Sequence, residues 1–132
     1  MPSEHPNAAL IRRFFSALAE RDAATAMSLL ADDAMWHFPG ERGALAGDHV
    51  GREGIARFLA SVMTLTNGTF DLDIHDITAS DEHAVVLFTG RGERNGKTLD
   101  NPTALVVLIA DGKVIELREY VWDIAHVDDF WS

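Results

Sequence analysis

The hydrophobic periodicity of this chain changes about half-way along its 132 residues. In the first part, apolar residues recur at helical spacing, as Leu10, Phe14 and Leu18 do. From Thr69 onward the period is two, so that Phe70 and Leu72 alternate with acidic neighbours. The sequence therefore predicts helices that cover one face of a sheet, in an α+β domain.

Two helices are expected before residue 34. The first follows the apolar stripe of residues 10–18, and Asn7 is the predicted cap of its first amides. The second begins after Asp22, another capping residue, and the acidic pair 32–33 is expected to end it.

A short strand and a third helix are expected next. Residues 35–38 are predicted to form the strand, and the glycines of residues 39–47 indicate a loop. The apolar residues of segment 55–63 lie on one stripe of a helix, and Asn67-Gly68 is expected to stop that helix.

The second half of the chain is expected to be an antiparallel meander of four strands. Turn sequences separate the strands at hairpin spacing: Ser80-Asp81, Asn95-Gly96 and Asp111-Gly112. Asn-Gly is the strongest short hairpin signal. Because no linker or internal repeat divides the chain, residues 1–132 are interpreted as one domain.

The chain is acidic, with 21 Asp and Glu against 11 Lys and Arg and a formal net charge of −10. Nucleic acid and anionic membranes are repelled by such a surface, so neither is an expected partner. Cysteine is absent from the sequence, which excludes disulfides and thiolate catalysis. The first seven residues lack the regions of a signal peptide, and a cytoplasmic location is expected.

Several short motifs follow one another in an order that resembles a known superfamily. They are Arg21-Asp22, residues 30–34, residues 47–51, residues 111–116, and Arg118-Glu119-Tyr120 with Asp123. The chain resembles the SnoaL-like and ketosteroid-isomerase-like branch of the nuclear transport factor 2-like (NTF2-like) superfamily along nearly its whole length. The resemblance implies a cone-shaped, curved, mostly antiparallel sheet with three helices packed across its concave face. The superfamily includes isomerases, cyclases, hydrolases and non-catalytic binding domains. The resemblance alone therefore does not indicate the function, which has to be inferred from the residues of the site.

Two acids near the end of the last predicted strand are expected to face the interior. Leu117 and Val121 are apolar, and period two places Glu119 and Asp123 on the same face. A carboxyl group in an apolar pocket has a raised pKa and can move a proton near neutral pH. In SnoaL-like cyclases an aspartate near this point is the general acid/base, and Asp123 matches it with an offset of one residue. Asp123 is therefore the first catalytic candidate and Glu119 the second, while the alternative for Asp123 is a cap of the C-terminal turn.

A second constellation is formed by Arg91 and Glu93. Arg91-Gly92-Glu93 resembles the arginine-x-aspartate of limonene-type epoxide hydrolases, in which an arginine links two acids. By this resemblance, Arg91 would hold Glu93 and Asp123 in opposite protonation states. The alternative is a solvated hairpin next to Asn95-Gly96.

The residues of ketosteroid isomerases are not expected in this chain. By the same resemblance, the base of that family falls on Phe38, its oxyanion-hole tyrosine on Phe14, and its protonated aspartate near Leu105. Since none of these side chains can transfer a proton, the steroid-isomerase machinery is absent.

A pocket for a small apolar organic ligand is predicted inside the domain. Its expected lining consists of Trp36, Phe38, Phe14, Asn101, Thr103, Leu117, Val121 and His49. Trp36 and Phe38 share strand parity and either stack on a flat ring or fill the core. Asn101 and Thr103 either provide inward hydrogen bonds or belong to an edge irregularity at Pro102.

Neither a metal nor a cofactor is expected. The six histidines have no close pair at metal-ligand spacing, and no dinucleotide or phosphate loop occurs in the sequence. The partner that we do expect is a second copy of the chain, because Tyr120 and Trp122 are predicted to lie on the outer face of the sheet.

The sequence thus predicts a cofactor-free enzyme that acts on an apolar carbonyl compound by acid/base proton transfer, as an isomerase or polyketide cyclase does. Two alternatives stay open: a limonene-type epoxide hydrolase, and a non-catalytic small-ligand-binding or assembly domain.

Overall fold

The computed structural model describes residues 4–132, in which helices and strands follow one another as the change of period predicts. The elements are α1 (Pro6–Ala19), α2 (Ala23–Ser28), β1 (Leu30–Phe38), β2 (Gly47–Val50), α3 (Gly51–Leu65), β3 (Asp71–Ala79), β4 (His83–Arg94), β5 (Lys97–Ala110), β6 (Lys113–Val121) and α4 (Ile124–Trp131).

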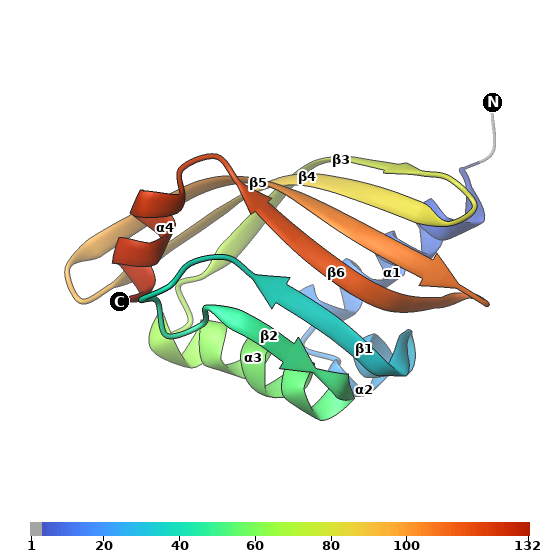
Figure 1. Ribbon diagram of the computed structural model, residues 1–132, viewed down its shortest axis with the longest axis horizontal. Coiled ribbons are helices and arrows are strands. Elements are labelled where there is room, and N and C mark those ends of the chain that lie inside the picture. Colours follow the sequence, from blue (N-terminus) through green and yellow to red (C-terminus); the bar gives the residue numbers. More distant parts are fainter. Residues whose placement is uncertain (1–3) are drawn as a thin grey trace.

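The six strands form one sheet in the order β2-β1-β6-β5-β4-β3. The β1–β6 pair is parallel and the other neighbours are antiparallel, so the predicted meander of β3 to β6 is confirmed. Figure 1 shows the long strands arching over α1 and α3, with α4 at one end of the sheet. This is the expected α+β architecture with a curved, mostly antiparallel sheet, to which α4 adds a helix that the sequence did not predict.

The helix starts were predicted with mixed success. Asp22 caps α2, because its side chain accepts a hydrogen bond from the Thr25 N–H at 3.1 Å. The predicted cap of α1 was wrong, since Nδ1 of His5 accepts the N–H of Asn7 at 3.0 Å. The Asn7 amide instead donates to the carbonyl groups of Ser80 and Asp81, which joins α1 to the β3–β4 turn.

The strand boundaries differ from the prediction in the first half. β1 already begins at Leu30, so the acidic pair Asp32 and Asp33 lies inside a strand and does not end a helix. The predicted glycine loop ends at Ala46, and residues 47–50 pair with the end of β1 as β2. β2 is a short edge strand with mostly exposed residues, and the start of β1 is likewise exposed at Asp32 and Asp33, so the apolar pattern detects neither segment.

The β4–β5 and β5–β6 turns were placed correctly from their residue types. Asn95 and Gly96 have φ angles of 52° and 76°, and Asp111 and Gly112 have 52° and 71°. Two consecutive left-handed residues make the turn that joins tightly paired strands. The two turns thereby fix the register in which Leu105 of β5 faces both Val86 of β4 and Glu119 of β6.

The core fills the space between the helices and the concave face of the sheet. From the helices it includes Ile11, Phe14 and Ile55, and from the sheet Leu105 and Leu117, all almost completely buried. Apolar residues of α1 and α3 therefore fill much of the concavity, and the part that they leave open becomes the pocket described next.

Candidate active site

A pocket of about 540 Å³ lies between α1, α3 and the concave face of the sheet. Its wall is mainly aromatic and aliphatic, with Phe15 and Leu59 contributed by helices and Phe70 and Phe88 by the sheet side. A few polar side chains, including Glu119 and Asn101, also line it. An apolar concavity of this size with few polar groups is typical of a small-molecule site.

Glu119 reaches this pocket from β6, as its strand parity predicts. Burial raises the pKa of its carboxyl group from about 4.5 to about 8, because an apolar wall stabilises the neutral form over the carboxylate. A hydrogen bond from Nε1 of Trp36 to Oε1, 2.9 Å long, acts in the opposite direction and favours the carboxylate. The balance leaves a carboxyl group that exchanges its proton close to neutral pH.

Trp36 is held firmly in the place from which it donates this bond. Its ring packs against Phe58 of α3 at a centroid distance of 5.1 Å and lies 6.4 Å from Phe14 of α1. Only 3% of the residue is exposed. Trp36 fills the core, as one of the two alternatives predicts, and it also lines the pocket. Phe38, two residues further along β1, also lines the pocket, as expected.

Asn101 is a second polar residue in the wall. It lies on β5, is 5% exposed, and lines the pocket as predicted. Thr103 is also buried, but it is not part of the wall, and its hydroxyl donates to the carbonyl of Asn101 at 3.2 Å. Both residues belong to regular strand pairing between β4 and β5, with Asn101 opposite Gly90, so Pro102 does not break the ladder.

The pocket is closed at one end by α4. Trp131 of this helix lines the pocket and packs 6.5 Å from the ring of Phe38 and 6.4 Å from that of Phe70. Sequence reasoning missed this residue. The signal was present, because a capping Asp123 followed by Val127, Phe130 and Trp131 at helical spacing indicates a short amphipathic helix.

The loop between β1 and β2 is tied to α4 by one carboxylate. Asp128 accepts hydrogen bonds from the backbone N–H groups of Glu41, Arg42 and Gly43 at 3.1, 2.9 and 2.6 Å. The N–H of Ala44 donates to the carbonyl of Trp131 at 2.8 Å. These bonds hold the pocket-lining end of α4 in position.

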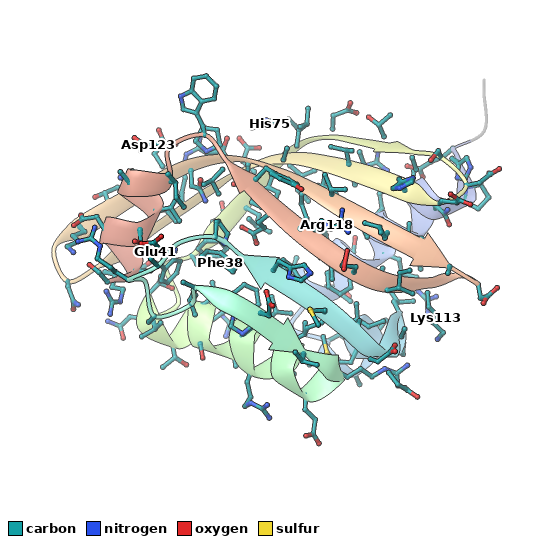
Figure 2. All side chains as sticks on the ribbon, viewed as in Figure 1. Phe38, Glu41, His75, Lys113, Arg118 and Asp123 are labelled. Carbon is teal, nitrogen blue, oxygen red and sulfur yellow. The ribbon has the colours of Figure 1, made fainter. Side chains whose placement is uncertain are left out.

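The structure places Asp123 outside the pocket. β6 ends at Val121, and Asp123 is exposed at the turn before α4, where Figure 2 labels it. Its carboxylate accepts the N–H of His126 at 3.1 Å and caps the helix. The strand period was extended two residues too far, so the expected inward direction was wrong and the capping alternative describes the contact seen.

Arg91 and Glu93 are not brought together with Asp123 at the pocket, since none of the three lines it. The guanidinium of Arg91 lies 3.5 Å from a carboxylate oxygen of Asp73 and 3.8 Å from one of Asp100, all of them solvent-accessible. Glu93 is exposed near the β4–β5 turn, and its backbone N–H donates to the hydroxyl of Thr69. The contacts are those of the solvated hairpin that was the alternative to the epoxide-hydrolase arrangement.

The other predicted lining residues lie near the pocket but not in its wall. Phe14 and Leu117 are core residues with about 1% exposure, and Val121 packs against the same core. Phe15, the neighbour of Phe14, takes the place in the wall. His49 lies in a separate, more open hollow beside α3, where its ring stacks on Phe58 and bonds the Leu45 carbonyl at 2.7 Å.

Within residues 4–132, His, Asp and Glu side chains do not gather into a group of three that can bind a metal ion. In the same range, none of the helices is long and apolar enough to span a membrane.

Comparison with known sequences identifies the family. Residues 11–117 match the SnoaL-like domain family. The chain belongs to this family. An uncharacterized protein of Mycobacterium tuberculosis is 31% identical over 124 residues, which cover 93% of this chain and 94% of the relative.

Solved structures agree with this membership. Bal32a, from a soil-derived mobile gene cassette, has a TM-score of 0.91 at 34% identity and covers 96% of this chain and 97% of its own. An NTF2-like protein of Burkholderia xenovorans has a TM-score of 0.82 at 24% identity, with 98% of both chains covered. A putative SnoaL-like polyketide cyclase from Jannaschia has a TM-score of 0.79 at 19% identity, with 100% of this chain and 95% of its own covered. The SnoaL-like, NTF2-like fold expected from the motifs is therefore confirmed.

Proposed function

We propose that this SnoaL-like protein is a cofactor-free enzyme that moves a proton on a small, mostly apolar carbonyl compound. The observation that carries the proposal is the carboxyl group of Glu119, which lines an apolar pocket with a pKa raised to about 8. A general acid/base works best when its pKa lies near the working pH. An ordinary glutamate, with a pKa near 4.5, would be too weak a base for this task.

The reaction follows from what one carboxyl group in this place can do. The carboxylate of Glu119 removes a proton from the carbon next to a carbonyl group, and the electron pair of the broken C–H bond enters an enolate. Where a C=C bond next to that carbon extends the enolate to a dienolate, return of the same proton to the far carbon moves the double bond and gives an isomer. Attack of the enolate carbon on a second carbonyl carbon of the same molecule gives a ring, after which Glu119 protonates the new alkoxide.

Each step conserves electrons and consumes no co-reactant. The description of the Jannaschia neighbour as a putative polyketide cyclase supports the ring-forming version. Trp36 acts here as a positioning residue, because its N–H fixes the direction of the Glu119 carboxyl group.

Glu119 thus takes the role for which Asp123 was the first candidate. Asp123 is solvent-exposed, and its carboxylate is engaged as a helix cap. The roles of the two acids can be distinguished by the same conservative substitution at each position, which replaces the carboxyl group with an amide.

The test uses hydrogen exchange on a simple enolisable ketone, because this requires no knowledge of the natural substrate. The protein is incubated in D₂O with 2-tetralone, and loss of the α-proton signals is followed by NMR. We expect the wild type to accelerate exchange and Glu119→Gln to lose roughly two to four orders of magnitude of that acceleration. Asp123→Asn is the matched control and should keep it.

A wild type that exchanges 2-tetralone no faster than buffer would contradict the proposal. So would a Glu119→Gln protein that is as fast as the wild type. In the first case, ligand binding to the pocket without turnover would support the non-catalytic binding domain instead.

A further inference from the structure

The mouth of the pocket is marked by the wall residues that are exposed to solvent. They come from the α1–α2 connection, from α3 and the turn after it, and from the start of β3: Ala19, Arg21, Ala23, Ala60, Gly68 and Asp71. Four of the six are alanine or glycine, which carry no functional group. The charged side chains at the mouth are therefore those of Arg21 and Asp71.

The carboxylate of Asp71 belongs to the outer face of the sheet. Asp71 lies opposite Arg91 in the β3–β4 ladder and two residues before Asp73. Opposite residues of a ladder share a face, and so do alternate residues of a strand. The carboxylate of Asp73 lies 3.5 Å from the guanidinium of Arg91 on that face. Arg21 is thus the charged side chain that remains at the mouth.

Arg21 has a backbone conformation that favours glycine. Its N–H donates to the Leu18 carbonyl at 3.1 Å, and the next N–H, of Asp22, donates to the Ala17 carbonyl at 2.8 Å. This pattern ends a helix with one residue in the left-handed region, and Arg21 has a φ angle of 58°. A side chain is strained at positive φ, so an arginine in such a place indicates a use for its side chain.

The guanidinium group of Arg21 is the one cation in the wall formed by residues 4–132, where it has no ion-pair partner. The neighbouring Asp22 already caps α2 by accepting the Thr25 N–H at 3.1 Å. The ion pairs of the same residue range involve other arginines: Arg12, Arg42, Arg52, Arg91 and Arg118. A guanidinium group at the opening of an apolar cavity is therefore available to an anionic ligand.

We infer that Arg21 binds a carboxylate group of the substrate at the mouth of the pocket. The substrate is then an apolar keto acid whose carbonyl end enters first and whose acidic end stays at the mouth. The inference rests on the proposed function for the carbonyl end, where Glu119 is the acid/base. It adds a specificity residue on a different element, in the connection between α1 and α2.

A carboxylate fits this position better than a more highly charged group. A guanidinium group presents two parallel N–H donors that match the two oxygens of one carboxylate. A phosphate dianion would bring twice the charge to a protein of formal net charge −10, with one arginine in the wall to compensate it. One cation and an apolar cavity therefore indicate an organic acid with a single negative charge.

The test uses two probes that differ only in charge. 9-Oxodecanoate has a methyl ketone at one end of a flexible apolar chain and a carboxylate at the other, and 9-oxodecanamide has a neutral amide in place of the carboxylate. Isothermal titration calorimetry at low ionic strength should give the wild type an affinity for the carboxylate about fivefold higher than for the amide. Added salt should reduce this preference, because it screens a charge pair at the surface.

Arg21→Gln should abolish the preference, since it removes the charge and keeps a polar side chain. Arg13→Gln is the matched control. Arg13 is an exposed arginine of the same helix that does not line the pocket, and its substitution changes the net charge by the same amount. The preference should survive in Arg13→Gln, which separates contact with Arg21 from the field of the whole protein.

Arg21→Gly distinguishes a lost contact from a damaged fold. Glycine fits the left-handed conformation, so this variant should melt at a higher temperature than the wild type and still lack the preference for the carboxylate.

Equal affinities of the wild type for the two probes, no binding of either probe, or a preference that persists in Arg21→Gln or Arg21→Gly would overturn the inference. The side chain of Arg21 would then only cover apolar surface with its stem and keep its charge in water. Calorimetry requires no turnover, and exchange on 2-tetralone, which has no acidic group, reports on Glu119. Failure at the mouth is therefore distinguishable from failure of the proposed reaction.

Discussion

Nε1 of Trp36 and Oε1 of Glu119 form a hydrogen bond of 2.9 Å between residues that are 83 positions apart in the sequence. The parallel pairing of β1 with β6, in which Trp36 lies beside Leu117, brings the two side chains together. The bond joins a rigid aromatic core to the one carboxyl group with a strongly raised pKa in the pocket wall. It therefore orients the Glu119 carboxyl group and partly opposes the larger effect of burial, which raises the pKa of that group.

The first prediction concerns the pH dependence of catalysis. Since the reactive form is the carboxylate, the rate constant for 2-tetralone exchange at low ketone concentration should rise with pH and level off above an apparent pKa of about 8. Measurement between pH 5 and pH 10, after subtraction of the buffer rate, gives this profile. A profile that levels off near pH 4.5 would mean that a solvated carboxylate is the base.

The second prediction separates the two opposing effects on Glu119. Trp36→Phe removes the N–H that favours the carboxylate, so the pKa of Glu119 should rise further and the exchange profile should move to higher pH. The side-chain carboxyl ¹³C shift of Glu119 reports the pKa directly. Trp122→Phe is the control because Trp122 is 86% exposed, and it should leave the titration unchanged. A lower pKa in Trp36→Phe would contradict this account.

The third prediction follows from the linkage between ionisation and folding. Burial raises the pKa of Glu119 in the folded protein to about 8, against about 4.5 in the unfolded chain. Its contribution to stability is therefore fully present below pH 4.5 and is lost as pH rises towards 8. Glu119→Gln has no such group. When the pH is raised from 5 to 9, its free energy of unfolding should therefore increase relative to that of the wild type by on the order of a few kcal/mol. Urea unfolding at both pH values measures the difference, and equal pH dependence in the two proteins would refute the expectation.

The fourth prediction tests the capping role of Asp123. Its carboxylate accepts the His126 N–H at the start of α4. Asp123→Ala should lower the free energy of unfolding by about 1 kcal/mol, whereas Asp123→Asn should cost only a few tenths because asparagine caps equally well. Chemical denaturation of the two variants provides the comparison. A stability loss in Asp123→Asn as large as that in Asp123→Ala would require another role for the charge.

The fifth prediction is a homodimer through the outer face of the sheet. Tyr120 of β6 is 57% exposed there, opposite Ala104 of β5, which is in turn opposite the exposed Leu87 of β4. An apolar strip across three strands is suited to a second copy of the same face. Light scattering at micromolar concentration should give the mass of a dimer, and Leu87→Lys should shift it towards that of a monomer. A wild type with the mass of a monomer would refute this interface.

The sequence predicted those parts of the fold for which the local pattern and the tertiary structure agree. The apolar stripe of α3 and the Asn95-Gly96 turn are such cases, since spacing and turn chemistry alone determine them. β2 was missed because it is short and owes its existence to pairing with β1. α4 was missed although its cap and its apolar spacing are in the sequence, because the strand period was carried through Asp123.

The sequence likewise predicted some residues of the candidate site correctly and others wrongly. Glu119, Trp36 and Asn101 follow from strand parity, which holds as long as the strand continues. Asp123 does not, because the strand ends at Val121 and its parity does not extend to a residue that caps the next helix. Phe14 and Phe15 are neighbours on one helix, and only the helix orientation decides that Phe15 lines the pocket.

Gly90 and Gly92 have a consequence for redesign of the protein. Both lie under Phe70, and an added Cβ would approach its ring to 3.4 Å from Gly90 and to 3.6 Å from Gly92. A methyl group at either position would therefore rest in ordinary van der Waals contact with Phe70, without displacing the ring and without touching Glu119. Two small positions on one strand thus leave room for added apolar bulk behind Phe70, which would brace this part of the pocket wall independently of the acid that lines it.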